Sequence, residues 1–188
     1  MLYDAPPTVP HADERISALE DVLASLELPG GRLTEAALAR LVTAVAARGE
    51  LFEDLVVDDP NDRWWMTLHE AENFDLRVLS WEHDQASDWH DHGGSSGAYV
   101  VTSGSLRERF RAGDHASVSE RIVTAGQVAS FDASHVHDVG YRSGSPAVSV
   151  HAYSPPLTGL TFYDRGPFGF VARGVVPEDS RRAFAVAA

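Results

Sequence analysis

The sequence predicts a mainly β protein, a small barrel or sandwich preceded by an α-helical extension. From Arg63 onward, short apolar stretches alternate with turn residues at even spacing, which is typical of an all-β sandwich or barrel. The first 60 residues differ, because their apolar residues recur three and four positions apart, as on one face of a helix. We expect a helical extension packed on the barrel over residues 1–60, the barrel over 61–176 and a tail over 177–188.

Two helices are expected in the extension. The first contains RISALEDVLASLEL and ends at the glycine-rich break PGG at 29–31. The second follows Thr34, whose hydroxyl suits the cap of a helix N-terminus, and stops near Gly49. FEDLV then adds a short turn before the loop DDPND. We expect these helices to cover apolar surface of the barrel.

Nine stretches are candidate strands of the barrel. They are RWWMTLHE, FDLRVLSWE, SDWHDH, GAYVVTSG, SLRERFRA, SERIVTA, QVASFD, VHDVGYR and AVSVHAYS. Turn-forming pairs separate them, among them Gly93-Gly94, Ser103-Gly104, Gly113-Asp114 and Ala125-Gly126. The segment LTFYDRGPFGFVARGVV is expected to add one or two closing strands.

Composition excludes several classes of protein. The formal net charge of −13 suits neither nucleic acid nor anionic lipid, since both require a basic surface. The chain of 188 residues has no cysteine, which excludes disulfides, thiolate ligands and a cysteine nucleophile. No apolar run reaches the ~18 residues that span a bilayer, and the N-terminus does not read as a signal peptide. We expect a cytoplasmic protein that binds neither nucleic acid nor membrane.

Histidines recur at a spacing that suits a metal site. His90 and His92 are two residues apart, so on a strand they would face the same side. Gly104 follows in the turn SGSL, and a further histidine, His137, lies in SHVHDV. His135 is two residues from His137 and would share its face, so spacing alone leaves either as a third ligand. In SVHAYSPP the same period places three polar side chains on one strand face: Ser149, His151 and Tyr153.

These patterns resemble the two motifs of the cupins, small double-stranded β-helix barrels related to jelly rolls. Many metal cupins carry a carboxylate four or five residues after the second histidine, where Ser96 and Gly97 stand here. A site of three neutral imidazoles keeps the full +2 charge of a metal and favours an incoming anion such as a thiolate. It also leaves coordination positions open, as catalysis requires.

HDHGGSSGAYVV, SHVHDV and PAVSVHAYSPPL resemble the thiol dioxygenases, most closely the bacterial cysteine dioxygenases. The resemblance covers roughly residues 63–163. It implies an enzyme that adds O2 to the sulfur of L-cysteine to give cysteine sulfinic acid. It implies one Fe(II) per chain, with the ligands His90, His92 and His137. It also implies a hydrogen-bonded relay of catalytic residues beside the metal: Ser149, His151 and Tyr153.

The resemblance also implies an arginine that binds the substrate carboxylate together with Tyr153. Arg63 is the candidate, because a guanidinium holds a carboxylate through two parallel hydrogen bonds. A different gap would put Met66 at that position, and Arg165 in LTFYDRG would then be the substitute. Mammalian members carry a cysteine that is crosslinked to the tyrosine. Gly97 stands at that position, so Tyr153 is expected to keep an ordinary hydroxyl.

Two other functions stay open at this point. A dioxygenase for 3-mercaptopropionate or another small thiol acid would use the same chemistry, with a different carboxylate anchor. A metal-binding cupin without oxygenase activity is the third possibility, since three histidines and a water also suit Zn²⁺. We expect the remaining histidines to be solvated or locally bonded: His69, His83 and His115. We expect the four tryptophans to pack in the barrel and against the helices: Trp64, Trp65, Trp81 and Trp89. No oligomeric state is predicted.

Overall fold

A computed structural model describes residues 12–112 and 117–177. The predictions for the tail beyond 177, for the turn at Gly113-Asp114 and for His115 lie outside these residues. The helices are α1 Ala12–Ser25 and α2 Glu35–Ala46, followed by two single 3₁₀ turns, η1 Gly49–Leu51 and η2 Glu53–Leu55. Within the described ranges, none of the helices has the length and apolar character needed to cross a membrane.

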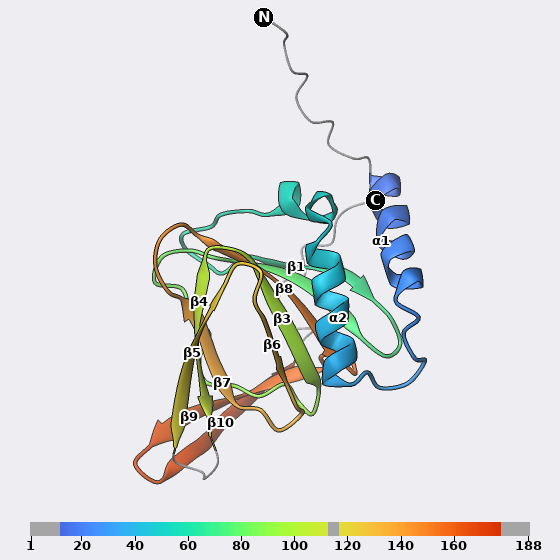
Figure 1. The fold of residues 1–188 in the computed structure, drawn as a ribbon. Coiled ribbons are helices and arrows are strands. Elements are labelled where there is room, and N and C mark those ends of the chain that lie inside the picture. The colour runs from blue at the N-terminus through green and yellow to red at the C-terminus, as the bar shows by residue number, and fades with distance from the viewer. Residues whose placement is uncertain (1–11, 113–116, 178–188) are drawn as a thin grey trace, which may run out of the picture.

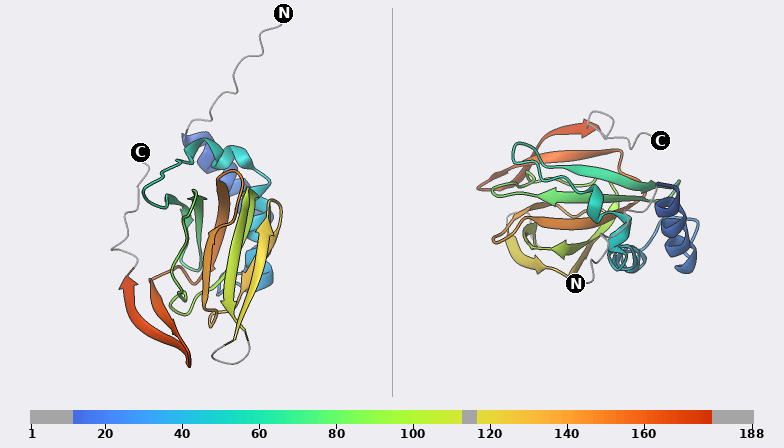
Figure 2. Two further views of the ribbon diagram at one scale, coloured as in Figure 1. Left: turned by 90° about the vertical axis from the view of Figure 1, so that its left-hand side faces the viewer. Right: turned by 90° about the horizontal axis from the view of Figure 1, so that it is seen from above.

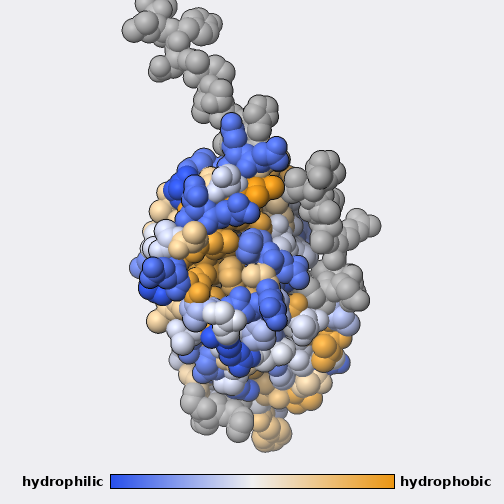
Figure 3. Space-filling view, turned by 90° about the vertical axis from the view of Figure 1, so that its right-hand side faces the viewer, coloured by the Kyte–Doolittle hydropathy of each residue, from blue (hydrophilic) through white to orange (hydrophobic). Residues whose placement is uncertain are grey.

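The second helix begins where the sequence predicts. The hydroxyl of Thr34 accepts a hydrogen bond from the backbone N–H of Ala37 at 3.2 Å, which satisfies one of the free donors of the first turn. Leu38, Leu41 and Val45 are fully buried and recur three and four residues apart, so α2 presents one apolar face to the barrel. Figure 3 shows the molecular face that carries the helices, where hydrophilic side chains surround an apolar band.

Ten strands form the barrel in the described part of the chain. They are β1 Trp65–Glu70, β2 Asp75–Trp81, β3 Ser96–Ser103, β4 Ser105–Arg111, β5 Val118–Thr124, β6 Val128–Phe131, β7 His137–Tyr141, β8 Ala147–Ser154, β9 Gly159–Gly166 and β10 Gly169–Pro177. One layer is a five-stranded sheet in the order β1-β2-β8-β3-β6, with all of its printed pairs antiparallel. The other layer contains the sheet β5-β4-β7 and the hairpin β9-β10 (Figure 1, Figure 2).

The segment at 86–91 joins the two parts of the second layer. Ser87 donates its backbone N–H to the carbonyl of Val139 on β7 (2.7 Å), and Tyr163 on β9 donates to the carbonyl of Trp89 (2.8 Å). The predicted strand SDWHDH is therefore extended but not a regular strand, because it pairs with β7 and β9 only through isolated bridges. It ends at the glycine pair 93–94, both with positive φ.

The central strands are buried on both faces, and the two faces differ in chemistry. On β2, Leu76 and Val78 pack in one apolar cluster with α1 and α2, while Leu79 and Trp81 pack in a second cluster inside the barrel. The alternation follows from the two-residue period of a strand. Figure 1 shows α2 lying across β3, β6 and β8, on the outer face of that sheet.

The predicted fold class, a mainly β barrel with N-terminal helices, is confirmed. The predicted closing strands are β9 and β10. The residue limits that divide the chain into extension, barrel and tail stay a prediction.

Candidate metal centre

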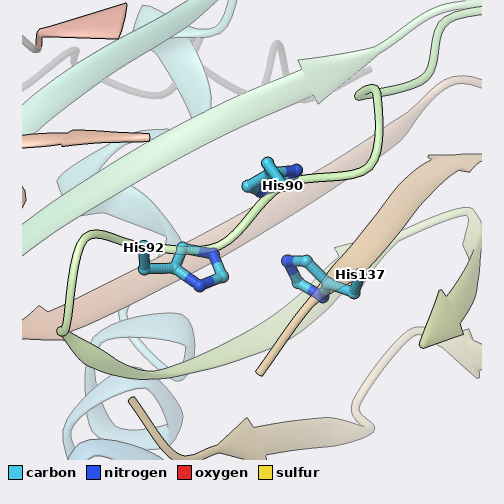
Figure 4. A group of neighbouring side chains, drawn as sticks. All are labelled: His90, His92 and His137. Atoms are coloured by element: carbon cyan, nitrogen blue, oxygen red, sulfur yellow. The ribbon is translucent and has the colours of Figure 1, made fainter. Parts of the chain in front are cut away.

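Three histidines converge inside the barrel (Figure 4). His90 and His137 face each other on neighbouring extended segments and exchange backbone hydrogen bonds of 2.8 and 3.0 Å. His92 follows on the same segment as His90, just before the glycine turn. One side-chain nitrogen of each ring lies within 4.8 Å of the others, close enough to hold one metal ion.

Two of these rings are each oriented by a hydrogen bond on Nδ1. His90 Nδ1 lies 2.8 Å from the carbonyl oxygen of Asp88, and His137 Nδ1 lies 2.8 Å from Oε1 of Glu108. Both partners are acceptors, so we assign the proton of each neutral ring to Nδ1. The Nε2 lone pair of each ring is then available as a metal ligand.

His92 has a different environment. Its ring is buried, and neither Nδ1 nor Nε2 has a hydrogen-bond partner among the described residues. Phe131 and Tyr153 stack on it, with ring centroids 4.6 and 5.3 Å away. A buried polar group without a partner is costly, so this ring fits a site that a metal ion completes.

Burial and neighbouring charges favour the neutral form of His92 and His137, which is the form that binds metals. Burial is the main cause that lowers the pKa of His92 well below its ordinary value, and repulsion from His137 and His90 adds to it. Burial also lowers the pKa of His137, although the carboxylate of Glu108 partly opposes this. Neutral imidazole is the form that binds metals, so no proton needs to be displaced near neutral pH.

His135 lies beside the cluster and faces a carboxylate. Its Nε2 is 3.0 Å from Glu108 Oε1, and its ring stacks on Phe131 at 4.9 Å. Its side-chain nitrogens are not part of the group formed by His90, His92 and His137. Between the two histidines that spacing left open, the geometry therefore favours His137 as the third ligand, which stays a prediction.

The three polar residues of β8 form a continuous chain of hydrogen bonds. Ser149 Oγ lies 2.8 Å from His151 Nε2, and His151 Nδ1 lies 3.1 Å from the hydroxyl of Tyr153. Trp81 extends the chain, because its indole N–H donates to Ser149 Oγ at 2.8 Å. We expected Trp81 only to pack, but FDLRVLSW places it on the inward face of its strand, and that alternation was the available signal.

We assign one direction to this chain. An indole nitrogen only donates, so Ser149 accepts from Trp81, and we assign its own hydrogen to the bond with His151 Nε2. Burial is the main cause that lowers the pKa of His151 to about 3, and the charges of His137, Arg63 and Arg77 contribute. The neutral ring then carries its proton on Nδ1 and donates to the oxygen of Tyr153. The phenolic hydrogen of Tyr153 is left to point to another acceptor.

A small cavity adjoins the histidines and the relay. Its volume is about 40 Å³. The lining includes metal-site and relay residues: His90, His137, His151 and Tyr153. Two arginines also line it, Arg63 and Arg77. Apolar side chains complete its wall, among them Trp65, Leu79, Trp81, Leu157 and Leu160.

The two arginines are held in different ways. The guanidinium of Arg63 lies over the ring of Trp81, 4.8 Å from its centroid. Arg77 is buried and donates to Asp75 Oδ2 from Nη2 (2.6 Å) and from Nε (3.2 Å), and it also lies over the ring of Trp65. Arg77 was not predicted from the sequence, although it lies two residues before Leu79 and therefore shares the inward face of β2.

The other candidates for the carboxylate anchor lie elsewhere. Met66 is buried in the cluster between the helices and the sheet, on the face opposite the cavity. Arg165 is exposed on β9, opposite Phe170 in the hairpin, and is not among the residues that line the cavity. The structure thus brings Arg63, and not Arg165, to the histidines.

An outer hollow of about 830 Å³ leads toward this cavity. The two share four lining residues: Arg63, Trp65, Ser87 and Leu160. Four aspartates line the outer hollow: Asp59, Asp62, Asp84 and Asp88. Arg63 therefore lies at the boundary between the inner cavity and the outer hollow.

Gly97 has no room for a side chain. A Cβ placed there would lie 2.3 Å from the ring of Phe131 and 3.1 Å from that of Tyr153. Gly97 pairs directly with Tyr153 across β3 and β8, and it is the position to which the resemblance assigns the crosslinked cysteine of mammalian members. The close packing of Phe131 thus fills the space that a thioether would need.

Two further histidines of the described chain, His69 and His83, lie outside the cluster of His90, His92 and His137. His69 is partly buried with its ring 5.4 Å from that of Phe74, and His83 is exposed beside Asp84.

A β barrel whose interior holds three converging imidazoles has the architecture of a metal-binding cupin. A solved structure described as an uncharacterized conserved protein with a double-stranded beta-helix domain, from Klebsiella pneumoniae, superposes with a TM-score of 0.51 at 18% identity. The match covers 58% of this chain and 86% of that chain, and it supports the fold alone. The sequence profile of the family cysteine dioxygenase type I matches residues 26–166. The chain belongs to this family.

Curated relatives match a shorter region. Cysteine dioxygenase type 1 of Homo sapiens is 31% identical over 100 residues, and that of Bos taurus is 32% identical over 100 residues. Each match covers 49% of this chain and 50% of the relative. The chain thus spans about half the length of the curated relatives it matches.

Proposed function

We propose that this protein is a thiol dioxygenase that converts L-cysteine to cysteine sulfinic acid, with one Fe(II) per chain. The ligands would be His90, His92 and His137. The observation that carries the proposal is the buried ring of His92, which has no hydrogen-bond partner in the described chain and lies against two further imidazoles. Membership of the cysteine dioxygenase type I family supports the same chemistry.

The donor set fits a catalytic metal. Three neutral imidazoles leave coordination positions open, and Ser96 and Gly97 supply no carboxylate. The site therefore keeps the full charge of a divalent ion and favours a thiolate as an added ligand. Iron(II), when bound, supplies the redox chemistry that transfers both atoms of O2 to the substrate sulfur.

The reaction balances without water. A thiolate and O2 give the sulfinate, so sulfur is oxidised by four electrons, O2 is reduced, and two sulfur–oxygen bonds form. The chain accordingly needs to hold the thiol and keep water out of the site. Leu79, Leu157 and Leu160 line the cavity and serve the second purpose. The cavity of about 40 Å³ shares Arg63 with the outer hollow, so a small thiol acid would place its sulfur beside the histidines and its carboxylate at the boundary between the two.

Arg63 and Tyr153 are the proposed substrate-binding residues. Arg63 lines both the inner cavity and the outer hollow, so its guanidinium lies on the approach that a substrate carboxylate would take. In the assigned tautomer Tyr153 accepts a hydrogen bond from His151, so the phenolic O–H would point toward the cavity that Tyr153 lines. There the hydroxyl would donate to the substrate or to oxygen, with Ser149 and His151 fixing its direction.

Oxygen consumption by the iron-reconstituted protein tests the proposal. L-cysteine, 3-mercaptopropionate and a thiol without a carboxylate are supplied separately, and the product mass is followed. Uptake with cysteine and a gain of two oxygen atoms are expected. Uptake with 3-mercaptopropionate alone would identify that thiol as the substrate and would still support a thiol dioxygenase. An iron-loaded protein that takes up no O2 with any of these thiols would be a metal-binding cupin instead.

Two arginine variants test the carboxylate anchor. Arg63→Gln is expected to raise KM for cysteine about 10- to 100-fold, since hydrogen bonds to charged groups contribute roughly 1.5–3 kcal/mol. Arg165→Gln is the matched control and is expected to leave KM unchanged, because Arg165 is exposed and outside the cavity. The opposite pattern would make Arg165 the anchor.

A cytoplasmic location stays a prediction.

A further inference from the structure

A buried carboxylate lies directly behind the metal-site histidines. Glu108 on β4 has no exposed surface, and its two oxygens receive four side-chain hydrogen bonds. Oε1 faces His137 Nδ1 at 2.8 Å and His135 Nε2 at 3.0 Å. Oε2 accepts from the hydroxyl of Tyr99 at 2.7 Å and from Nε of Arg121 at 2.5 Å.

The surroundings of Glu108 favour its ionised form. The guanidinium of Arg121 lies against Oε2, and the ring nitrogens of His135 and His137 both face Oε1. An ionised carboxylate has acceptors only, so every group directed at it must donate.

We propose that Glu108 is a positioning residue that fixes His137 in the Nδ1–H tautomer and thereby sets the metal affinity of the site. His137 can satisfy Glu108 only with its proton on Nδ1, which leaves Nε2 unprotonated on the side of His90 and His92. The carboxylate also increases the basicity of the ring, as such partners do for ligating histidines. This inference rests on the metal site proposed above and adds a residue to it.

The same residues do not make a better second metal site. Side-chain atoms of Glu108, His135 and His137 lie close enough together to hold an ion. However, both nitrogens already face one carboxylate oxygen at hydrogen-bonding distance, and Arg121 places a positive charge on the other oxygen. A cation there would displace these contacts and meet the guanidinium. The cluster is therefore complete without a metal, in contrast to His92.

Tyr99 links this cluster to the relay. Its hydroxyl bonds to Glu108, and its ring stacks on His151 with centroids 5.0 Å apart and planes inclined by 14°. Tyr99 is fully buried. One side chain thus contacts both the carboxylate behind the metal ligand His137 and the relay histidine His151.

The first test reads the tautomer directly in the wild-type protein. Long-range ¹H–¹⁵N correlation spectra of the metal-free, ¹⁵N-labelled full chain report which ring nitrogen of each histidine is protonated. We expect His137 to be neutral with a protonated Nδ1 and an unprotonated Nε2. A neutral His137 with its proton on Nε2 would overturn the inference. This measurement needs no variant, so it decides the question even where a substitution at Glu108 prevents folding.

The second test measures metal affinity without any thiol. Anaerobic Fe(II) binding is followed by competition with a chelator for wild type, Glu108→Gln, His135→Gln and His90→Ala. Glu108→Gln is expected to weaken binding about 10- to 100-fold, the usual effect of losing such a partner. His135→Gln is the matched control and should stay within about threefold of wild type, because Glu108 keeps its contact with His137.

The outcomes separate the two proposals. A folded Glu108→Gln with wild-type affinity, beside a weakened His90→Ala, would overturn the role of Glu108 and leave the metal site intact. Wild-type affinity in His90→Ala would overturn the metal site and this inference with it. Weak binding in Glu108→Gln and His90→Ala, with normal binding in His135→Gln, supports both, whatever thiol the enzyme oxidises.

Discussion

The two faces of strands β2 and β8 consist of residues adjacent in sequence, but the faces have different roles. Toward the helices, the strands present Leu76, Val78, Val150 and Ala152, all fully buried in an apolar cluster. Toward the barrel interior, alternate positions present polar groups: Arg77, Ser149 and His151. In the pairing of β2 with β8, Leu76 lies opposite Ala152 and Arg77 lies opposite His151.

The difference shows what each face depends on. The outer face requires only apolar side chains of suitable volume, and its free energy comes from removing apolar area from water. The inner face requires a defined partner for each polar atom, since a buried polar group without one is destabilising. The inner face accordingly holds the candidate chemistry, and the outer face holds the sheet against α1 and α2.

The largest effect is expected at the inner face, at the metal ligands. His90→Ala removes one of three imidazoles and should weaken Fe(II) binding on the order of 100-fold or more, since loss of an outer partner alone typically costs 10–100-fold. Iron content after reconstitution and chelator competition measure this. His83→Ala is the control, because His83 is exposed and outside the cluster. Equal iron loss in both variants would show a general instability.

The outer face should respond in stability and not in chemistry. Leu76→Ala leaves a cavity between β2 and the helices and should lower the free energy of unfolding by about 2–5 kcal/mol. Urea denaturation of the metal-free protein measures the loss. Oxygen uptake per folded, iron-loaded molecule should stay near that of wild type. A large loss of turnover in folded Leu76→Ala would mean that the two faces are not independent.

Tyr153→Phe sharpens the comparison within the inner face. It removes the hydroxyl at the end of the relay and should lower kcat about 10- to 100-fold, within the range for a hydrogen bond to a charged group. Bound iron should stay at the wild-type level, since Tyr153 lies outside the three-histidine group. Tyr141→Phe is the control, because that hydroxyl bonds to the carbonyl of Gly144 at the surface. Unchanged turnover in Tyr153→Phe would remove its assigned role.

The sequence was informative where a period or a propensity decides the structure. The cap at Thr34, the helices and the alternation of β8 could all be predicted, because each depends on residues close together in the chain. Arg77, Trp81 and Glu108 were missed. Their roles depend on contacts between strands far apart in sequence, such as Trp81 with Ser149 and Glu108 with His137. No local pattern separates a buried tryptophan that packs from one that also donates a hydrogen bond.

The segment SDWHDH shows a different limit. Alternation predicted a regular strand, but the chain there is held by isolated bridges to β7 on one side and to β9 on the other. His90 and His92 nonetheless lie close together, with ring centroids 5.0 Å apart. The spacing of the two histidines was enough to predict that they are neighbours. The backbone conformation of the segment depends on its pairing with β7 and β9, which the spacing does not reveal.

Per pH unit, the smallest effect is expected in the dependence of stability on pH. The pKa of His151 is lowered to about 3 in the folded protein, chiefly by burial, against an ordinary value of 6.5. Between these values the unfolded chain binds a proton that the folded chain does not, so acid favours unfolding. The free energy of unfolding of the metal-free protein should therefore fall as pH decreases from 6.5 toward 3.

One such group contributes a slope of about 1 kcal/mol per pH unit, and His92 adds to it in the same direction. His151→Asn should therefore flatten the decline by about that amount between pH 6 and pH 4. His83→Asn, at an exposed position, should leave the slope as in wild type. Urea midpoints and m-values at several pH values measure both variants. The free energy of unfolding could instead fall with the same slope in His151→Asn and His83→Asn. The acid sensitivity would then not come from the inner face, and electrostatics would not distinguish that face from the apolar outer face.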